Sequence, residues 1–332
     1  MFKYCSAPWS TIHIDQIGLI SSCFCNAWHQ KGYNGNILTT PLRELFNNDW
    51  QEEFRQSILD QSFSWCRKDI CVDFYRMDPV ETWDFLPKLP QLPTTIQLQI
   101  DNNCNLKCEI CRPKNIYYPK IRSTAYKILE RLIEEYRDFT DKVHIHCDGY
   151  GDVFASPTYL EFLNRDDLPK CFYFSIQTNG NLVTKNIDVI TKIKNQIQMV
   201  EVSLDAATDE TYKLVRGGNF KQVKDGIKLL KELGITVWTQ YVVYQKNYLE
   251  ILDYIELCKQ LGVDKICLQS VAKMRHMTNE WWAENTLETN KNIDYSFLFS
   301  VIEQVKQDPQ IEVSGGFEYL LENKKVITLR PL

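Results

Sequence analysis

Three cysteines lie within eight residues of one another in the segment DNNCNLKCEICRPKN, at Cys104, Cys108 and Cys111. Cysteine thiolates are strong ligands for soft metals, so this spacing indicates a metal site. A structural zinc site is normally closed by four ligands, and the segment offers no fourth. Three thiolates instead suit a [4Fe-4S] cluster in which one iron keeps an open position. The spacing therefore predicts a cluster whose open iron can bind and reduce another molecule.

The cysteine content of the whole chain supports a metal-binding interpretation, because the sequence contains twelve cysteines. The cytosol keeps thiols reduced, and a chain of 332 residues does not need disulfides to fold. Besides the triplet, five cysteines fall in the first 71 residues, at Cys5, Cys23, Cys25, Cys66 and Cys71. The other four lie singly on apolar segments, and we expect them to be small core residues: Cys147, Cys171, Cys258 and Cys267.

A regular alternation of β-rich and amphipathic segments must position the triplet. Six strands are predicted, at residues 94–100, 142–147, 171–177, 199–204, 236–244 and 265–270. Helices are predicted between and after them, within 121–138, after Pro157, near 184–194, within 208–233 and at 248–261. This order predicts an α/β fold with a parallel sheet, closed or partly closed into a (β/α) barrel. The triplet follows the first strand, at the end of the barrel where active sites lie.

The chain is predicted to divide into four segments. Residues 1–73 form a small cysteine-rich domain, and residues 74–93 form a linker because this stretch is rich in proline and lacks helical periodicity. The barrel spans residues 94–275, and residues 276–332 form a C-terminal helical or lid extension with a helix near 294–307. In this extension, Trp281 and Trp282 either cover a substrate or pack against that helix.

Length and charge narrow the classes of function. The chain is long enough for one large α/β domain and a smaller one, and 44% of its residues are hydrophobic. The net charge is −5, and the 38 basic residues are scattered, which gives no footprint for nucleic acid or an anionic membrane. The N-terminus does not resemble a signal peptide, and the longest weakly polar run, residues 17–28, is too short to span a bilayer. We expect a cytoplasmic protein with no nucleic-acid or membrane partner.

The pattern Cys-x3-Cys-x2-Cys after the first strand of a partial (β/α)6 barrel resembles the signature of the radical S-adenosylmethionine (radical SAM) superfamily. In that superfamily the amino and carboxylate groups of S-adenosylmethionine chelate the open iron. An electron from the cluster then splits this molecule into methionine and a 5′-deoxyadenosyl radical, which abstracts hydrogen from a substrate. The resemblance implies that Cys104, Cys108 and Cys111 hold the catalytic cluster. It also implies an electron donor of the flavodoxin or ferredoxin type. The cofactor carries out the radical chemistry, and the protein supplies binding and orientation.

Further segments resemble the superfamily's S-adenosylmethionine contacts. The sequence GYGD stands where the family has Gly-Gly-Glu-Pro, so Asp152 replaces the usual Glu and Val153 the usual Pro. Hydroxyl and carboxylate groups can bond ribose hydroxyls, and a guanidinium can fork onto a carboxylate. The resemblance implies contacts to the amino group from Gly149, Tyr150, Gly151 and Asp152, to the ribose from Ser203 and Asp205, to the carboxylate from Arg216, and to the nucleoside from Asn247. It also places Thr178 and Asn179 at the rim, and Leu268 or Ile266 behind the adenine, although either apolar side chain could be core.

The first 73 residues resemble the auxiliary-cluster (SPASM or twitch) domains of radical SAM maturases, although such domains usually follow the barrel. The resemblance implies that Cys5, Cys23, Cys66 and Cys71 ligate a second [4Fe-4S] cluster, with Cys25 as a substitute or spare. Four thiolates would close such a cluster and suit electron transfer or structure. A tetrathiolate zinc site has the same number of ligands and remains open as an alternative.

Together these features predict a radical SAM enzyme of the oxidoreductase or maturase type that modifies a ribosomal peptide or protein. A first alternative is radical modification of a small molecule such as a sugar or a cell-surface precursor. A second, from another class, is a non-catalytic iron–sulfur or zinc protein that senses redox state or forms a scaffold. The substrate and the outcome of the reaction cannot be read from the sequence.

Overall fold

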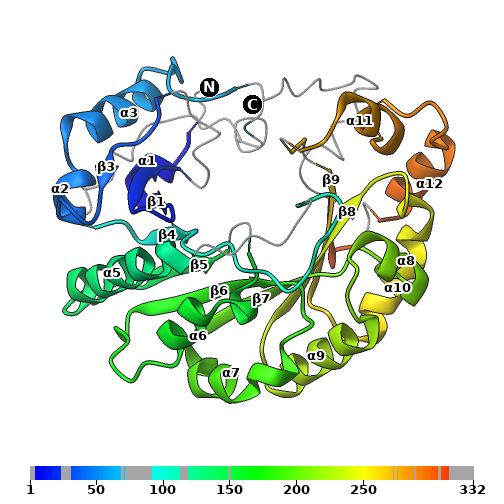
Figure 1. Ribbon diagram of the computed structural model, residues 1–332. Coiled ribbons are helices and arrows are strands. Elements are labelled where there is room, and N and C mark those ends of the chain that lie inside the picture. Colours follow the sequence, from blue (N-terminus) through cyan, green and yellow to red (C-terminus); the bar gives the residue numbers. More distant parts are fainter. Residues whose placement is uncertain are drawn as a thin grey trace. The chain divides into compact units, whose positions relative to one another are not determined.

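The computed structural model describes residues 4–23, 31–68, 71, 92–112, 119–148, 151–271, 273–274, 276–287, 289–305 and 308–313. The chain divides into two compact units, each assembled from separate stretches of sequence (Figure 1). Unit 1 comprises residues 1–103, 117–151 and 156–175, and unit 2 comprises residues 104–116, 152–155 and 176–332. Among the described helices, none is both long and apolar enough to cross a lipid bilayer.

Unit 1 is built on a sheet with the strand order β5-β4-β1-β2-β3. Its strands are β1 (Thr11–Ile14), β2 (Leu19–Ser22), β3 (Gly35–Asn36), β4 (Thr95–Leu98) and β5 (Val143–Cys147). Its helices are α1 (Ala7–Ser10), α2 (Leu42–Leu45), α3 (Asp49–Leu59), α5 (Pro119–Tyr136) and α6 (Pro157–Leu163). Local signals fix the helix starts: Asn48 caps α3 by accepting from the Gln51 N–H, and Ser156 caps α6, whose first residue is a proline.

The sequence analysis missed a strand pairing between the N-terminal segment and the first strand of the predicted barrel. Strand β1 runs parallel to β4, with Thr11 opposite Thr95 and Ile14 opposite Leu98. Strand β1 has only four residues, TIHI, and its polar side chains are buried together with its apolar ones, so its pattern is too short to identify a strand by itself. In unit 1 the N-terminal residues therefore extend the sheet. The predicted linker falls largely outside the described residues, and the predicted domain boundaries remain predictions.

Unit 2 contains a parallel sheet with the strand order β10-β9-β8-β7 and the helices that connect its strands. Strand β6 (Phe172–Thr178) passes from unit 1 into unit 2. The remaining strands are β7 (Ile197–Ser203), β8 (Val237–Val243), β9 (Lys265–Ser270) and β10 (Ile311–Val313). The helices are α7 (Ile187–Ile193), α8 (Asp209–Val215), α9 (Phe220–Glu232), α10 (Ile251–Gln260), α11 (Asn279–Asn285) and α12 (Tyr295–Val305), with short 3-10 turns η2 (Val153–Ala155), η3 (Thr184–Asn186), η4 (Lys194–Gln196) and η5 (Tyr248–Glu250).

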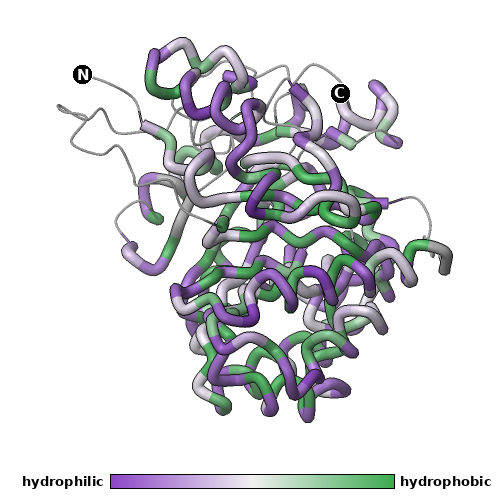
Figure 2. Tube along the Cα trace, turned by 90° about the vertical axis from the view of Figure 1, so that its left-hand side faces the viewer, coloured by the Kyte–Doolittle hydropathy of each residue, from purple (hydrophilic) through white to green (hydrophobic). Residues whose placement is uncertain are grey.

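The two faces of β8 and β9 have different environments. On one face, the ring centroids of Tyr241 and Tyr254 of α10 are 4.3 Å apart, and Thr239 Oγ1 lies 3.4 Å from Cys258 Sγ of the same helix. Leu268 lies opposite Tyr241 in the register and is fully buried on this helix-packed face. Burying a side chain of that size stabilises the fold by about 2 kcal/mol. The alternation of hydrophobic and hydrophilic residues that produces such faces is visible along the trace (Figure 2).

The predicted α/β fold class is confirmed. All six predicted strands are present as β4 to β9, each is followed by a helix, and the pairs β4–β5, β7–β8 and β8–β9 are parallel. This is the strand–helix series expected for a partial (β/α)6 barrel. The predicted C-terminal helix is present as α12, whereas strand β10, which pairs in parallel with β9, was missed. The four isolated cysteines are buried, as predicted for core residues.

Candidate active site

The cysteine triplet lies on the loop that follows β4, and backbone hydrogen bonds from the N–H groups of Cys111 and Arg112 to the Cys108 carbonyl, each 3.0 Å long, turn this loop. Burial raises the pKa of the Cys104 thiol to about 11 and also raises the pKa of Cys108. Each of these thiols is also affected by the charge of the next cysteine in the triplet, which indicates that they lie near one another. A bound metal would reverse this preference for the neutral thiol, because metal ligands are thiolates.

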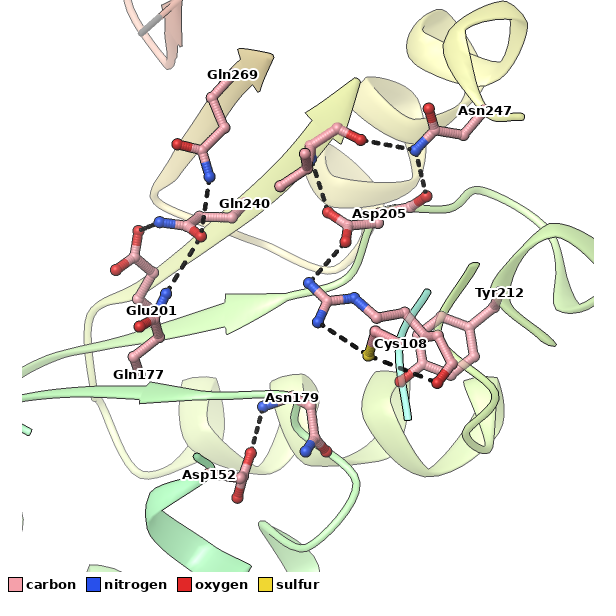
Figure 3. A network of polar contacts seen from close by, with 12 residues as sticks. Cys108, Asp152, Gln177, Asn179, Glu201, Asp205, Tyr212, Gln240, Asn247 and Gln269 are labelled. Atoms are coloured by element: carbon pink, nitrogen blue, oxygen red, sulfur yellow. Dashed lines mark hydrogen bonds and ion pairs between the residues drawn. The ribbon is translucent and has the colours of Figure 1, made fainter. Parts of the chain in front are cut away.

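A buried ion pair lies against the triplet. Arg216 Nη2 is 2.6 Å from Asp205 Oδ2, and Arg216 Nη1 is 3.6 Å from Cys108 Sγ (Figure 3). Asp205 Oδ1 accepts a 2.7 Å hydrogen bond from the Val242 N–H of β8. Burial raises the pKa of Asp205, and the positive charge of Arg216 opposes that rise. The pair thus places one fixed positive charge beside a sulfur atom of the triplet.

Asp152 joins two loops that the sequence analysis named separately. Its Oδ2 accepts a 2.6 Å hydrogen bond from the Asn179 N–H (Figure 3). Oδ2 also accepts from Thr178 Oγ1 (2.9 Å), and Oδ1 accepts from the Phe154 N–H (3.0 Å). Asn179 Nδ2 in turn lies 3.8 Å from Cys104 Sγ. Residues predicted from three separate motifs therefore form one hydrogen-bonded group around the cysteine loop.

The residue before Asp152 must be a glycine because backbone atoms approach Gly151 closely. A Cβ atom at this position would lie 2.6 Å from the Asp101 carbonyl oxygen and 2.7 Å from that of Asn103, so any side chain would collide with backbone. Gly149 and Tyr150, the other predicted members of this turn, lie outside the described residues.

The cysteines of the N-terminal segment gather in unit 1. Cys23 and Cys66 are buried in a cluster with aromatic residues that include Trp9, and Cys5 packs against the same cluster. Burial raises the pKa of Cys66 to about 12, and the neighbouring thiols of Cys5 and Cys71 raise it further. The structure therefore brings the four predicted ligands into one neighbourhood, while Cys25 lies outside the described residues. Across the part of the chain that the structure describes, no three Cys, His, Asp or Glu side chains are arranged to hold a metal ion as they stand.

Two family models match the chain, and together they decide its identity. The model of the radical SAM superfamily matches residues 98–258, and a model of an iron–sulfur cluster-binding domain (SPASM) matches residues 5–71. Residues 98–258 of the chain form a radical SAM domain. The match to the SPASM model confirms that the auxiliary domain precedes the barrel in this radical SAM protein.

Curated relatives with different activities resemble the chain. The antilisterial bacteriocin subtilosin biosynthesis protein AlbA of Bacillus subtilis (strain 168) is 29% identical over 179 residues, which are 52% of this chain and 38% of that protein. The sporulation killing factor maturation protein SkfB of the same strain is 25% identical over 181 residues, 52% of this chain and 41% of that protein. A GTP 3′,8-cyclase of Lactiplantibacillus plantarum is 28% identical over 176 residues, 51% of this chain and 52% of that protein. The chain thus spans about half or less of each relative.

The cofactors of this radical SAM protein are a [4Fe-4S] cluster and S-adenosylmethionine, with a second cluster in the SPASM domain. The side chains present fit these groups. Three thiols of the matched motif share one loop, and buried Arg216 supplies a fixed positive charge beside them. Within the described residues Arg216 Nε has no hydrogen-bond partner, so it is available to donate to an anionic group. The assignment of individual ligands and contacts remains a prediction.

The other predicted contacts occupy different environments. Ser203 lies on the face of β7 opposite the helix-packed face, because it pairs with Gln240 of β8. The Asn247 amide is committed to the protein backbone: Nδ2 donates to the carbonyls of Asp205 (3.0 Å) and Val242 (2.9 Å), and Oδ1 accepts from the Tyr244 N–H (2.9 Å). Leu268 lies on the helix-packed face, which supports the alternative that it is a core residue.

Sequence reasoning missed a second set of contacts around the cysteine loop. Glu109 Oε2 is 2.6 Å from Lys246 Nζ, and Glu109 Oε1 accepts a 2.8 Å hydrogen bond from Trp281 Nε1. The Glu109 carbonyl lies 3.1 Å from His276 Nε2. The indole of Trp281 is therefore bonded to the residue after Cys108, and the two predicted roles of Trp281, covering a substrate or packing, remain predictions. Glu109 lies inside the motif, but its partners are more than a hundred residues away in sequence, and no local signal connects them.

A row of polar side chains on β6 to β9 was also missed. Gln177 Nε2 and Gln269 Nε2 each lie 3.3 Å from Gln240 Oε1, and Gln240 Nε2 donates to Glu201 Oε1 (Figure 3). We call these four residues, three glutamines and the glutamate that accepts from one of them, the amide row. All four are half-buried, and the register places Glu201, Gln240 and Gln269 on the face opposite the helix-packed one, where Gln177 reaches Gln240. Strand-by-strand alternation could have found three of them, because Gln177, Glu201 and Gln240 are each flanked by buried positions on both sides.

Proposed function

We propose that this protein is a radical SAM enzyme that modifies a peptide or protein substrate. The observation that carries the proposal is the cysteine loop matched by the superfamily model, held against the Arg216–Asp205 pair and the Asp152–Asn179 group. When bound, the cluster and S-adenosylmethionine supply a 5′-deoxyadenosyl radical that takes a hydrogen atom from the substrate. We propose an electron donor of the flavodoxin or ferredoxin type, and a cytoplasmic location on the basis of cysteine usage.

The protein's own side chains bind and orient the cofactors and shield the site. Arg216 offsets negative charge next to Cys108, and Asp205 keeps the guanidinium in place through an ion pair of 2.6 Å. Asp152 fixes the loops after β5 and β6 to each other. Such fixed dipoles and charges lower the cost of charge development, since they need no reorganisation during the reaction.

Two observations support a peptide substrate. The relatives AlbA and SkfB are named for bacteriocin biosynthesis and for maturation of a killing factor. The amide row offers donors and acceptors on the open face of β6 to β9, and Gln177 directly precedes Thr178 of the candidate site. Amide side chains match the alternating donors and acceptors of a peptide backbone. The GTP 3′,8-cyclase relatives favour the alternative of a small-molecule substrate.

The proposal is tested with the anaerobically reconstituted chain, dithionite and S-adenosylmethionine, by measuring 5′-deoxyadenosine. A synthetic peptide encoded by a short reading frame beside the gene is added in one arm, and GTP in another. Formation of 5′-deoxyadenosine with a mass change of the peptide is expected. Conversion of GTP in place of the peptide would transfer the function to small-molecule chemistry. No 5′-deoxyadenosine in any arm would favour a non-catalytic cluster protein.

Replacing Gln240 by leucine is expected to lower peptide turnover about tenfold while leaving peptide-independent cleavage of S-adenosylmethionine unchanged. Gln240 is hydrogen-bonded to the three other members of the amide row, so its loss removes the contacts that hold their side chains in position for a bound backbone. The matched control is Gln260→Leu on α10, where the amide bonds only Glu256 on the exposed helix surface. Equal turnover in both variants would remove the amide row from peptide binding.

A further inference from the structure

A buried hydroxyl lies without a partner at the end of β8. Tyr244 follows the last residue of this strand and is completely buried, yet its Oη forms no hydrogen bond with any residue that the structure describes. A buried polar group left unpaired usually costs about 1–3 kcal/mol. Native proteins avoid such groups unless they serve a ligand, a water molecule or the chemistry of a site. The Tyr244 hydroxyl therefore needs a physical explanation.

The surroundings of Tyr244 place it in the candidate site. Val242, two residues before Tyr244, donates a 2.7 Å hydrogen bond to Asp205 Oδ1, and the other oxygen of that carboxylate is 2.6 Å from Arg216 Nη2. The backbone N–H of Tyr244 donates to Asn247 Oδ1, and its ring centroid is 6.3 Å from that of Trp281, the residue bonded to Glu109. Burial, aided by Glu109 and Asp205, raises the pKa of Tyr244, so the hydroxyl keeps its proton and is a donor.

Arg216 supplies a second unpaired donor in the same neighbourhood. Its Nη1 and Nη2 are used by Cys108 and Asp205, whereas its Nε has no hydrogen-bond partner in the described part of the chain. An unpaired O–H and an unpaired N–H of a cation together select a ligand with acceptor oxygens, preferably charged ones. A carboxylate satisfies both requirements, and a neutral hydroxyl satisfies only the first.

We propose that Tyr244 is a cofactor-binding residue whose hydroxyl donates a hydrogen bond to the carboxylate of bound S-adenosylmethionine, beside Arg216. The inference rests on the proposed function, because it requires that the chain bind S-adenosylmethionine. It assigns a role to a side chain that neither the cysteine motif nor the predicted nucleoside contacts include. It also explains why a phenol, and not the phenylalanine that would pack equally well, occupies this buried position.

The test compares Tyr244→Phe with Tyr254→Phe, a matched change to a second buried phenol whose hydroxyl also has no hydrogen-bond partner among the described residues, but which lies on the helix-packed face against Tyr241 and away from the candidate site. The dissociation constant of S-adenosylmethionine is measured by anaerobic equilibrium dialysis on proteins of equal iron content. Tyr244→Phe is expected to raise the constant about tenfold, the loss of one hydrogen bond to a charged group. Tyr254→Phe is expected to leave it unchanged. Equal constants for wild type and Tyr244→Phe would overturn the assignment.

Decarboxylated S-adenosylmethionine identifies the group that is contacted. Wild type and Tyr244→Phe are expected to bind this analogue equally, because it lacks the proposed acceptor. An equal weakening for both ligands would place the contact elsewhere and reject the carboxylate. The urea midpoint without ligand is expected to be unchanged or higher in Tyr244→Phe, and a lower midpoint would indicate a structural role for the hydroxyl. If the wild type does not bind S-adenosylmethionine, the proposed function itself is wrong. If the wild type binds it and Tyr244→Phe binds it equally well, only the Tyr244 assignment is wrong.

Discussion

Replacing Cys108 by alanine is expected to abolish cleavage of S-adenosylmethionine, while Cys66→Ala retains at least part of it. Cys108 is the central cysteine of the matched motif, and a cluster that loses one of three protein ligands is not held in place. Cys66 belongs to the separate SPASM match, in an aromatic cluster of unit 1. The measurement is 5′-deoxyadenosine formed anaerobically with dithionite. Equal loss in both variants would mean that the two cluster sites do not act separately.

Cys258→Ala is the control for this pair, because Cys258 is a buried cysteine of α10 that contacts Thr239 on the helix-packed face. It is expected to retain full cleavage despite a modest loss of stability. Iron and sulfide analysis completes the comparison: about eight irons in the reconstituted wild type and about four after all three motif cysteines are changed to alanine. If the wild type instead contains about four irons and the triple variant none, the N-terminal site holds no [4Fe-4S] cluster, and zinc becomes its candidate metal.

Replacing Arg216 by methionine is expected to destabilise the protein by about 3–5 kcal/mol, since it leaves the fully buried carboxylate of Asp205 without its countercharge. The measurement is urea unfolding of the chain without cofactors, followed by the binding constant of S-adenosylmethionine. The double variant Arg216→Met with Asp205→Asn is expected to recover part of the stability, because no unpaired charge remains. It is not expected to recover cofactor binding, because the guanidinium is still absent.

The control is Lys213→Met, which breaks the ion pair with Asp209 on the exposed surface of α8, the helix that ends beside Arg216. Exposed pairs contribute about 0–1 kcal/mol, so the expected loss is small. A loss for Arg216→Met no larger than for Lys213→Met would contradict the interpretation that the Arg216–Asp205 pair is a structural support of the candidate site.

Features encoded by neighbouring residues could be predicted from sequence. The triplet Cys104, Cys108 and Cys111 is recognisable because its spacing alone brings three thiols onto one loop. Strands β4 to β9 are recognisable because apolar residues recur with the period of a half-buried strand, and the helices between them begin at capping residues such as Ser156 and Asn219. These signals act over a few residues, so they survive without any knowledge of the fold.

Features that depend on distant contacts required the tertiary structure. The parallel pairing of β1 with β4, the ion pair of Asp205 with Arg216 and the bonds from Lys246 and Trp281 to Glu109 join parts of the chain that no local pattern connects. The face on which Leu268 lies was open in the sequence and follows only from its register with Tyr241. The sequence by itself thus determined the class of chemistry and the order of the elements. Only the tertiary structure decided which buried groups are paired, because burial and partnership are properties of packing and not of neighbouring residues.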